Sequence, residues 1–199
     1  MRFHLGAIPS SPDFVPDPSW RRLREPSTWL ERLVVFPIGV VAAAIVAALW
    51  FGLTPLRDVR HAISLPAVLL SLAGTVVVHE LLHALVHPMA GRSPDSIVGF
   101  DPSPARGGFY GHYCGEMSRN RFLAILLVPL VVLSIVPLLL SGVAQVAPGW
   151  VAFVSVFNAF AACADMLDAG LVLFQVPATG IVRQQSWRTY WREYDPLAA

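Results

Sequence analysis

The sequence contains no lysine, few charged residues and only two cysteines. Charged side chains make up 14% of its 199 residues, hydrophobic ones make up 55%, and the mean hydropathy is +0.60. This balance excludes an ordinary soluble domain. Because the net charge is only +1 and no basic stripe is interleaved with aromatics, we expect no nucleic-acid partner. Cys114 and Cys163 lie in different predicted environments, so we expect no disulfide between them.

The first 30 residues are polar and proline-rich, and they lack the apolar core of a cleavable signal peptide. Four later stretches are apolar and longer than the roughly 20 residues that cross about 30 Å of hydrocarbon. They cover residues 33–53, 63–89, 122–146 and 150–176. The sequence therefore predicts an all-α membrane protein with four transmembrane helices, the first of which is retained.

The arginines predict how these helices are oriented. All fourteen basic residues are arginine, and only Arg57 and Arg60 lie between the first and second stretches, while none lies between the third and fourth. The other twelve lie on what would be the opposite side. The positive-inside rule then places an N-terminal arm (1–32), the central loop and a C-terminal tail (177–199) in the cytoplasm. Both termini are therefore expected to be cytoplasmic.

The second apolar stretch contains the pattern H-E-x-x-H at residues 79–83. Two histidines four residues apart on a helix are separated by about 400° of rotation and about 6 Å of rise, so both can reach one metal ion. In the metallopeptidase interpretation, His79 and His83 bind Zn²⁺, and Glu80 is the general base that takes a proton from the attacking water. In the alternative, these groups satisfy one another or line a polar contact between helices.

A catalytic zinc site takes three protein ligands, so a third donor is needed. Asp165, in the fourth stretch, lies at about the same depth as His79, in the cytoplasmic half of the membrane. It is the first candidate, although a carboxylate here could instead form a hydrogen bond between helices. Asp168, one turn later, is the second candidate, or else an acceptor that fixes a histidine tautomer.

The H-E-L-L-H-A-L run, Gly91, and the segment from Asn158 to Asp165 resemble the bacterial and archaeal membrane family described as "putative zincin peptidase". This family is similar in layout to the site-2 proteases, which are intramembrane zinc metalloproteases. The resemblance runs from about Trp20 to Arg192. It implies Zn²⁺ as the cofactor, His79, His83 and Asp165 as its ligands, and Glu80 as the base. It also implies a membrane-anchored protein or peptide substrate, and a location in the lipid bilayer of the cytoplasmic membrane.

Two departures from these patterns concern the third ligand. Cys163 and Ala164 stand where the family usually has a small Ser/Gly pair, and Leu167-Asp168-Ala169 stands where site-2 proteases have Leu-Asp-Gly. By the family pattern Asn158 lies two helical turns before the third ligand. Its carboxamide could donate to the oxyanion formed during hydrolysis, as a catalytic residue, or form a plain hydrogen bond between helices.

The segment from Gly91 to Asn120 is the long loop between the second and third stretches. Its prolines and glycines exclude a helix, while residues 96–100 and 108–113 are typical of short strands, which predicts a β-hairpin-like cytoplasmic loop. In the resembling proteases such an edge is thought to hold an unwound substrate as an added strand. The alternative is a solvated connector.

We therefore predict an intramembrane zinc metallopeptidase that hydrolyses membrane-anchored substrates near the cytoplasmic face. Two alternatives remain: a non-catalytic membrane protein that binds zinc for stability or partner binding, and a small metal or proton conduit. Glu80 distinguishes them, because binding needs only the ligands whereas hydrolysis needs the base as well.

Overall fold

The computed structural model describes residues 1–11, 13–54, 65–103, 108–145 and 149–194. Arg57, Arg60 and Arg106, and the ends of two predicted stretches at 63–64 and 146, lie outside these residues. The chain forms two compact units. The sheet unit comprises Met1–Glu25, Glu80–Leu126 and Asp168–Ala199, and the helical unit comprises Pro26–His79 and Leu127–Leu167. The boundary between His79 and Glu80 falls inside one uninterrupted helix, α2.

Most of the described chain is helical, as predicted. The helices, in order, are α1 (Thr28–Leu53), α2 (Leu65–Val86), α3 (Arg119–Leu130), the π-helical turn η2 (Val131–Ile135), α4 (Val136–Ala144), α5 (Gly149–Ala161) and α6 (Cys163–Gln175). Among the described residues, three helical segments are long and apolar enough to cross a membrane: Thr28–Leu53, Leu65–Val86 and Arg119–Ala144. These three helices are compatible with a membrane protein.

The fourth predicted stretch is not one straight helix. It consists of α5 and α6, which are bent by 48° at Ala162, and it counts as a fourth span only if the bent pair is taken as one. The bend makes Asp165 a first-turn residue of α6. A carboxylate in that position faces the partial positive charge of the helix N-terminus.

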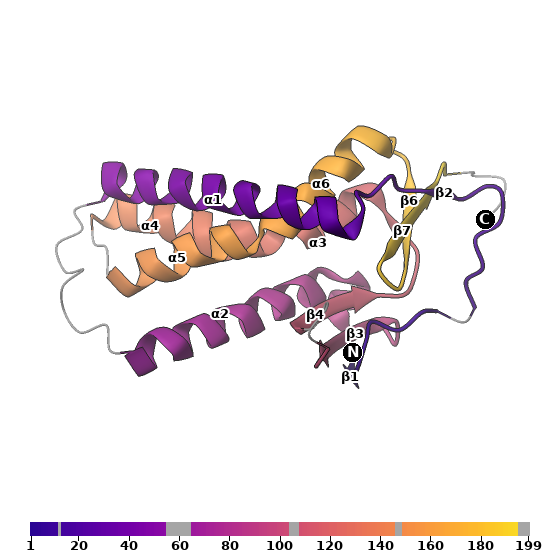
Figure 1. Cartoon of the computed structure of the whole chain (residues 1–199), viewed down its shortest axis with the longest axis horizontal. Helices are drawn as coiled ribbons and strands as arrows, with labels where there is room; N and C mark the ends of the chain where they lie inside the picture. The colour runs from indigo at the N-terminus through magenta and orange to yellow at the C-terminus, as the bar shows by residue number, and fades with distance from the viewer. Residues whose placement is uncertain (12, 55–64, 104–107, 146–148, 195–199) are drawn as a thin grey trace. The chain divides into compact units, whose positions relative to one another are not determined.

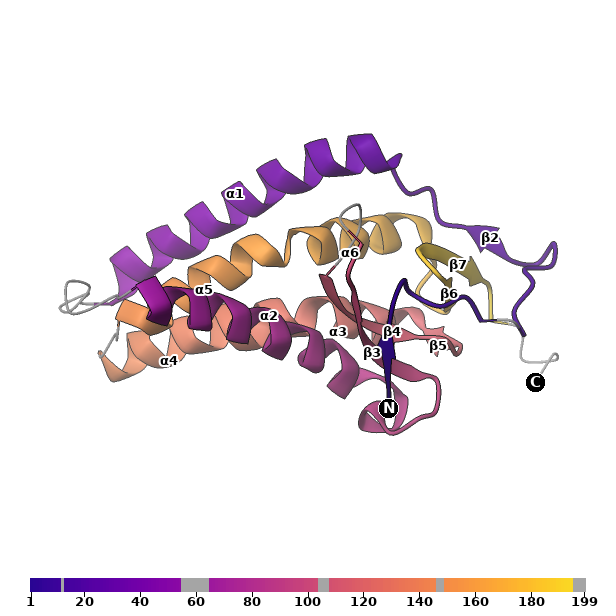
Figure 2. The same cartoon turned by 60° about the horizontal axis from the view of Figure 1, so that its bottom comes forward.

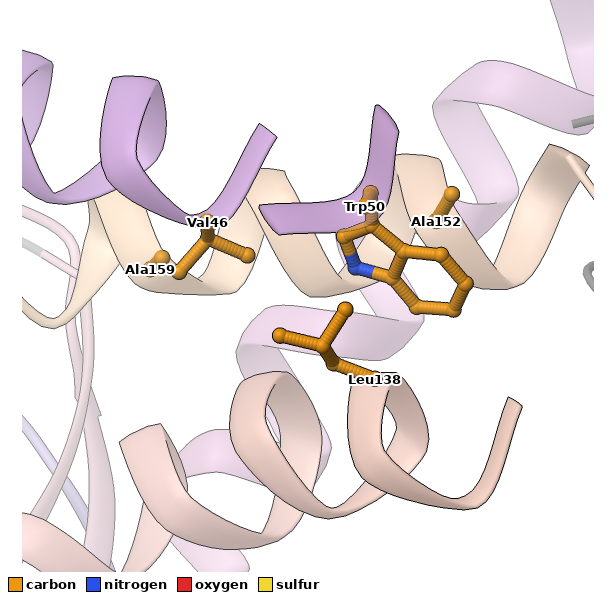
Figure 3. Close-up of a cluster of buried hydrophobic side chains, with 5 residues drawn as sticks. All are labelled: Val46, Trp50, Leu138, Ala152 and Ala159. Atoms are coloured by element: carbon orange, nitrogen blue, oxygen red, sulfur yellow. The ribbon is translucent and has the colours of Figure 1, made fainter. Parts of the chain in front are cut away.

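In the helical unit, α1 lies beside α5, and α4 packs against both (Figure 1). The close-up in Figure 3 shows the core that joins them, with side chains from all three helices. Its buried members are Val46, Trp50, Leu138, Ala152 and Ala159. Gly39 allows α1 to approach α5 closely, because a Cβ at position 39 would lie 2.9 Å from the carbonyl oxygen of Phe160 in α5.

A buried polar network lies in the same unit. The indole Nε1 of Trp50 donates to Ser155 Oγ at 2.8 Å. Ser155 Oγ in turn donates to the carbonyl of Ser134 at 2.9 Å, and Ser134 Oγ donates to the carbonyl of Ser155 at 2.8 Å. Ser134 belongs to the π-helical turn η2, where the regular hydrogen-bond ladder of the helix is interrupted. These paired bonds fix η2 against α5.

The sheet unit contains two small sheets. The first has the order β1-β3-β4 and the second β2-β7-β6-β5. Their strands are β1 (Arg2–Leu5), β2 (Arg21–Arg22), β3 (Ser96–Asp101), β4 (Gly108–Tyr113), β5 (Met117–Ser118), β6 (Ile181–Gln185) and β7 (Arg188–Arg192). Figure 2 shows β1 alongside the β3–β4 hairpin, to which it adds in parallel.

The β3–β4 hairpin confirms the strands predicted in the central loop, with β3 extended by one residue to Asp101. The description of the protein as all-α is nevertheless wrong. The arm and the tail supply β1, β2, β6 and β7, which pair with each other or with the central loop. These strands are two to five residues long, too short for the alternation of apolar and polar residues to reveal them.

Helix α2 ends where proline stops it. His87 is extended (φ −54°, ψ 156°) because the residue before a proline is pushed out of the helical region, and Pro88 begins the 3₁₀ turn η1 (Pro88–Gly91). Gly91 then adopts φ 75°, and a Cβ there would lie 2.6 Å from the carbonyl oxygen of Ala84. Only glycine fits this turn, which directs the chain from α2 into the hairpin.

Candidate metal centre

Helix α2 carries both histidines of the H-E-x-x-H pattern on one side. Each is only 6% exposed, although several apolar residues on the opposite side, such as Leu81 and Leu85, are exposed. An exposed apolar side is what a helix in a lipid environment requires, whereas buried imidazoles need hydrogen-bond or metal partners. The contacts of the ring nitrogens of His79 and His83 therefore define the site.

His79 has a defined partner on each ring nitrogen. Its Nδ1 lies 2.9 Å from Asn158 Oδ1, near the end of α5, and its Nε2 lies 3.0 Å from Asp165 Oδ2, in the first turn of α6. All three residues belong to the helical unit.

The orientation of the Asn158 amide decides the tautomer of His79. Asn158 is fully buried, and its Nδ2 donates to the Pro129 carbonyl and to Ser134 Oγ, both at 2.9 Å. A carbonyl can only accept, so the amide nitrogen must face Pro129 and the amide oxygen must face His79. His79 Nδ1 therefore donates to Asn158, which leaves the lone pair on Nε2.

These contacts bear on the two roles considered for Asn158. Both N–H donors of the amide have partners inside the helical unit, so neither is directed at a substrate oxyanion. The contacts favour the hydrogen bond between helices, and they give it a purpose, since a metal-binding histidine needs its other nitrogen held by an acceptor.

His83 is fixed in the same way through a different acceptor. Its Nδ1 donates to the backbone carbonyl of Ile125, in α3, at 2.7 Å. In a regular helix this carbonyl would accept from the N–H of residue 129, but that residue is proline and has none. The Ile125 carbonyl is therefore available to accept from His83 Nδ1. Because Nδ1 carries the proton, the lone pair of His83 lies on Nε2.

The potential ligand atoms of His79, His83 and Asp165 lie within 4.8 Å of one another, and among the described residues these three form a group that could hold a metal ion. The donor set of two imidazoles and one carboxylate suits Zn²⁺. Donors at about 2.0–2.1 Å from a tetrahedral zinc are about 3.3 Å apart, which is close to the 3.0 Å between His79 Nε2 and Asp165 Oδ2. The residues therefore fit the ion.

The structure separates the two candidate aspartates. Asp165 is part of the group with the histidines, and its side chain is 18% exposed. Asp168 follows one turn later on α6 and is not a member of that group. The residues brought together are thus the ligand set that the resemblance implies.

Glu80 is held by the neighbouring hairpin. Its Oε2 accepts a hydrogen bond of 2.8 Å from the backbone N–H of Gly111, in β4. A Cβ at position 111 would lie 3.0 Å from the Glu80 carbonyl oxygen and 3.1 Å from His83 Cβ, so glycine permits β4 to contact α2 directly. The sequence predicts the strand but gives no sign that its backbone contacts the Glu80 carboxylate.

Two further buried histidines, His87 and His112, lie in the sheet unit. His87 is 1% exposed, and its Nδ1 lies 3.0 Å from Ser96 Oγ. His112 is 2% exposed, and its Nε2 has no hydrogen-bond partner among the described residues. Burial lowers the pKa of His112 to about 4. His112 is therefore neutral near pH 7.

Comparison with known families gives a match to one family model. The model of a family described as "Putative zincin peptidase" matches residues 72–181, which is more than half of the chain. The protein belongs to this family, whose description indicates a zinc metallopeptidase. The matched segment includes residues 72–86 of α2, in which the H-E-x-x-H pattern lies, the hairpin and both helices of the bent pair. No curated protein and no solved structure gives a significant match.

Proposed function

We propose that the protein is an intramembrane zinc metallopeptidase that hydrolyses membrane-anchored proteins or peptides near the cytoplasmic face. One observation carries this proposal. His79 Nδ1 donates to Asn158, so the lone pair on His79 Nε2 faces the Asp165 carboxylate at 3.0 Å. Two acceptors at this separation repel each other unless a proton or a metal cation lies between them. Together with His83, they form a site suited to a zinc ion.

The residues of the chain divide the work of hydrolysis. When bound, zinc polarises the substrate carbonyl and makes a water molecule more acidic. Glu80 takes a proton from the attacking water and delivers it to the departing amine, so that one water and one peptide bond become a carboxylate and an amine. The Gly111 N–H holds the Glu80 carboxylate in place for both transfers.

The hairpin provides a place for the substrate backbone. Strand β4 is an outer strand of its sheet, and the Gly111 N–H points toward Glu80 rather than toward β3. The Val98–Gly111 pair is therefore a non-hydrogen-bonded one, and the backbone groups of Phe109 and Tyr113 point outward with it. A substrate added along this edge as an extra strand would bring its peptide bond to Glu80.

We propose four spans, with the bent pair α5–α6 as the fourth and both termini in the cytoplasm. The distribution of arginine supports this orientation. A reporter inserted after Ser103 should read as cytoplasmic, and one inserted after Gln145 should read as external. The opposite pattern would place the site on the other face of the membrane.

The catalytic step is tested by Glu80→Gln, which retains the shape of the side chain but removes the base. Zinc should stay bound, while cleavage falls by at least the roughly 100-fold expected from the loss of general base catalysis. Because the substrate is defined only by class, membrane proteomes of cells with wild type and variant are compared for single-span proteins that accumulate uncut. Glu31→Gln, in the first turn of α1, is the matched control. Identical proteomes with zinc in both proteins would favour a non-catalytic zinc protein.

A further inference from the structure

Two backbone carbonyls one helical turn apart in the third helical segment act on the two zinc-binding histidines. The Ile125 carbonyl accepts from His83 Nδ1 at 2.7 Å. The Pro129 carbonyl accepts from Asn158 Nδ2 at 2.9 Å, and Asn158 Oδ1 accepts from His79 Nδ1 at 2.9 Å. Because a carbonyl oxygen can only accept, His83 Nδ1 and Asn158 Nδ2 must be the donors. Asn158 Oδ1 then accepts from His79 Nδ1.

Pro129 explains why the first carbonyl is available. In an α-helix the carbonyl of residue 125 accepts from the N–H of residue 129, and proline has no N–H. The ring of a proline also clashes with the carbonyl four residues earlier and turns it away from the helix axis. Both effects expose the Ile125 oxygen to His83.

The helical residues that follow Pro129 hold Asn158, which donates to the Pro129 carbonyl. The π-helical turn η2 begins at Val131, and its Ser134 Oγ accepts the other N–H of Asn158 at 2.9 Å. Ser134 and Ser155 also exchange hydrogen bonds that tie η2 to α5, the helix that carries Asn158. The amide of Asn158 is thus held in one orientation, with its oxygen toward His79.

We infer that Pro129 is a positioning residue of the metal centre: its missing N–H frees the Ile125 carbonyl for His83, and its own carbonyl orients Asn158 and thereby His79. This inference rests on the proposed zinc site. On this inference, the helical turn from Ile125 to Pro129 keeps Nδ1 protonated in His79 and His83, so that their Nε2 lone pairs face the ion.

The experiment reads the tautomers directly. In ¹⁵N NMR of zinc-free wild-type protein in detergent, labelled with ¹⁵N-histidine, Nδ1 should be protonated in both His79 and His83, whether or not a proton shared with Asp165 lies on His79 Nε2. In Pro129→Ala, the new N–H competes for the Ile125 carbonyl, so His83 should lose its fixed tautomer and zinc affinity should fall about 10 to 100-fold. In Asn158→Ala, His79 should lose its tautomer while His83 keeps it.

Pro137→Ala is the matched control, because it adds an N–H to the same helical segment eight residues farther on. Its tautomers and zinc affinity should equal those of wild type. An Nε2–H tautomer of either histidine in wild type would overturn the inference, even if Pro129→Ala does not fold. So would a Pro129→Ala protein with wild-type tautomers and zinc affinity. The tautomers are measured without zinc or substrate. A protein with Nδ1 protonated in His79 and His83 that cleaves no substrate would therefore refute the proposed activity and still support the role of Pro129.

Discussion

The side-chain oxygen of Asn158 accepts a hydrogen bond from His79 Nδ1 at 2.9 Å, and this contact links Asn158 to the proposed metal centre without making it a proposed ligand. The amide is fully buried, and both of its N–H groups point to Pro129 and Ser134. In the proposed reaction, Asn158 would therefore act only through His79.

Asn158→Ala should consequently weaken zinc binding by about 10 to 100-fold, the range typical of residues that orient a metal ligand. The measurement is competition with a chelator of known affinity, at a pH held constant across variants. If Asn158 instead donated to the substrate oxyanion, zinc affinity would be unchanged and only kcat would fall. That second result would return Asn158 to a catalytic role.

Replacing the two aspartates separately tests the identity of the third ligand. Asp165→Ala should remove a ligand and reduce zinc occupancy strongly, because Asp165 Oδ2 lies beside His79 Nε2. Asp168→Ala should leave the zinc bound. The metal content of both purified variants, measured side by side, decides the matter. Zinc lost from the Asp168 variant and kept in the Asp165 variant would show that the ligand is misassigned.

The sequence alone predicts the ligands better than it predicts what holds them. H-E-x-x-H places His79 and His83 on one side of a helix by spacing alone, and matching depth makes Asp165 the first candidate for the third ligand while leaving Asp168 as the second. Spacing carries no information on which backbone carbonyl faces an imidazole, so the contact of Ile125 with His83 could not be foreseen. A hydrogen bond between helices was one of the two roles considered for Asn158, but its partner His79 could not be foreseen. Pro129 was the available signal, since a proline inside a helix always leaves one carbonyl without its usual donor.

The limits on predicting the fold have a similar cause. Long apolar stretches predict helices of about the observed length. The 48° bend at Ala162 could not be predicted, because no proline or glycine lies at that position. The short strands depend on pairing between distant segments, such as Arg21 with Trp191. Pairing of this kind is decided by tertiary structure and leaves no local pattern.

Buried His112 predicts a pH-dependent stability. Its pKa is about 4 in the folded protein because of burial, against 6.5 when exposed. The folded state then favours the neutral ring, so stability is complete above pH 6.5 and is lost as the pH falls toward 4, by about 3 kcal/mol in all. Thermal unfolding in detergent should show this loss for wild type and a much smaller one for His112→Leu. Parallel pH profiles of the two proteins would contradict the assignment.

The most direct test of the central claim is the metal content of the detergent-purified protein. About one zinc per chain is expected, since the site has the two-histidine, one-carboxylate donor set of a catalytic zinc. His79→Ala and His83→Ala should each lose the metal, while His4→Ala, a histidine in β1, should keep it. Zinc retained at the wild-type level in both His79→Ala and His83→Ala would contradict the account.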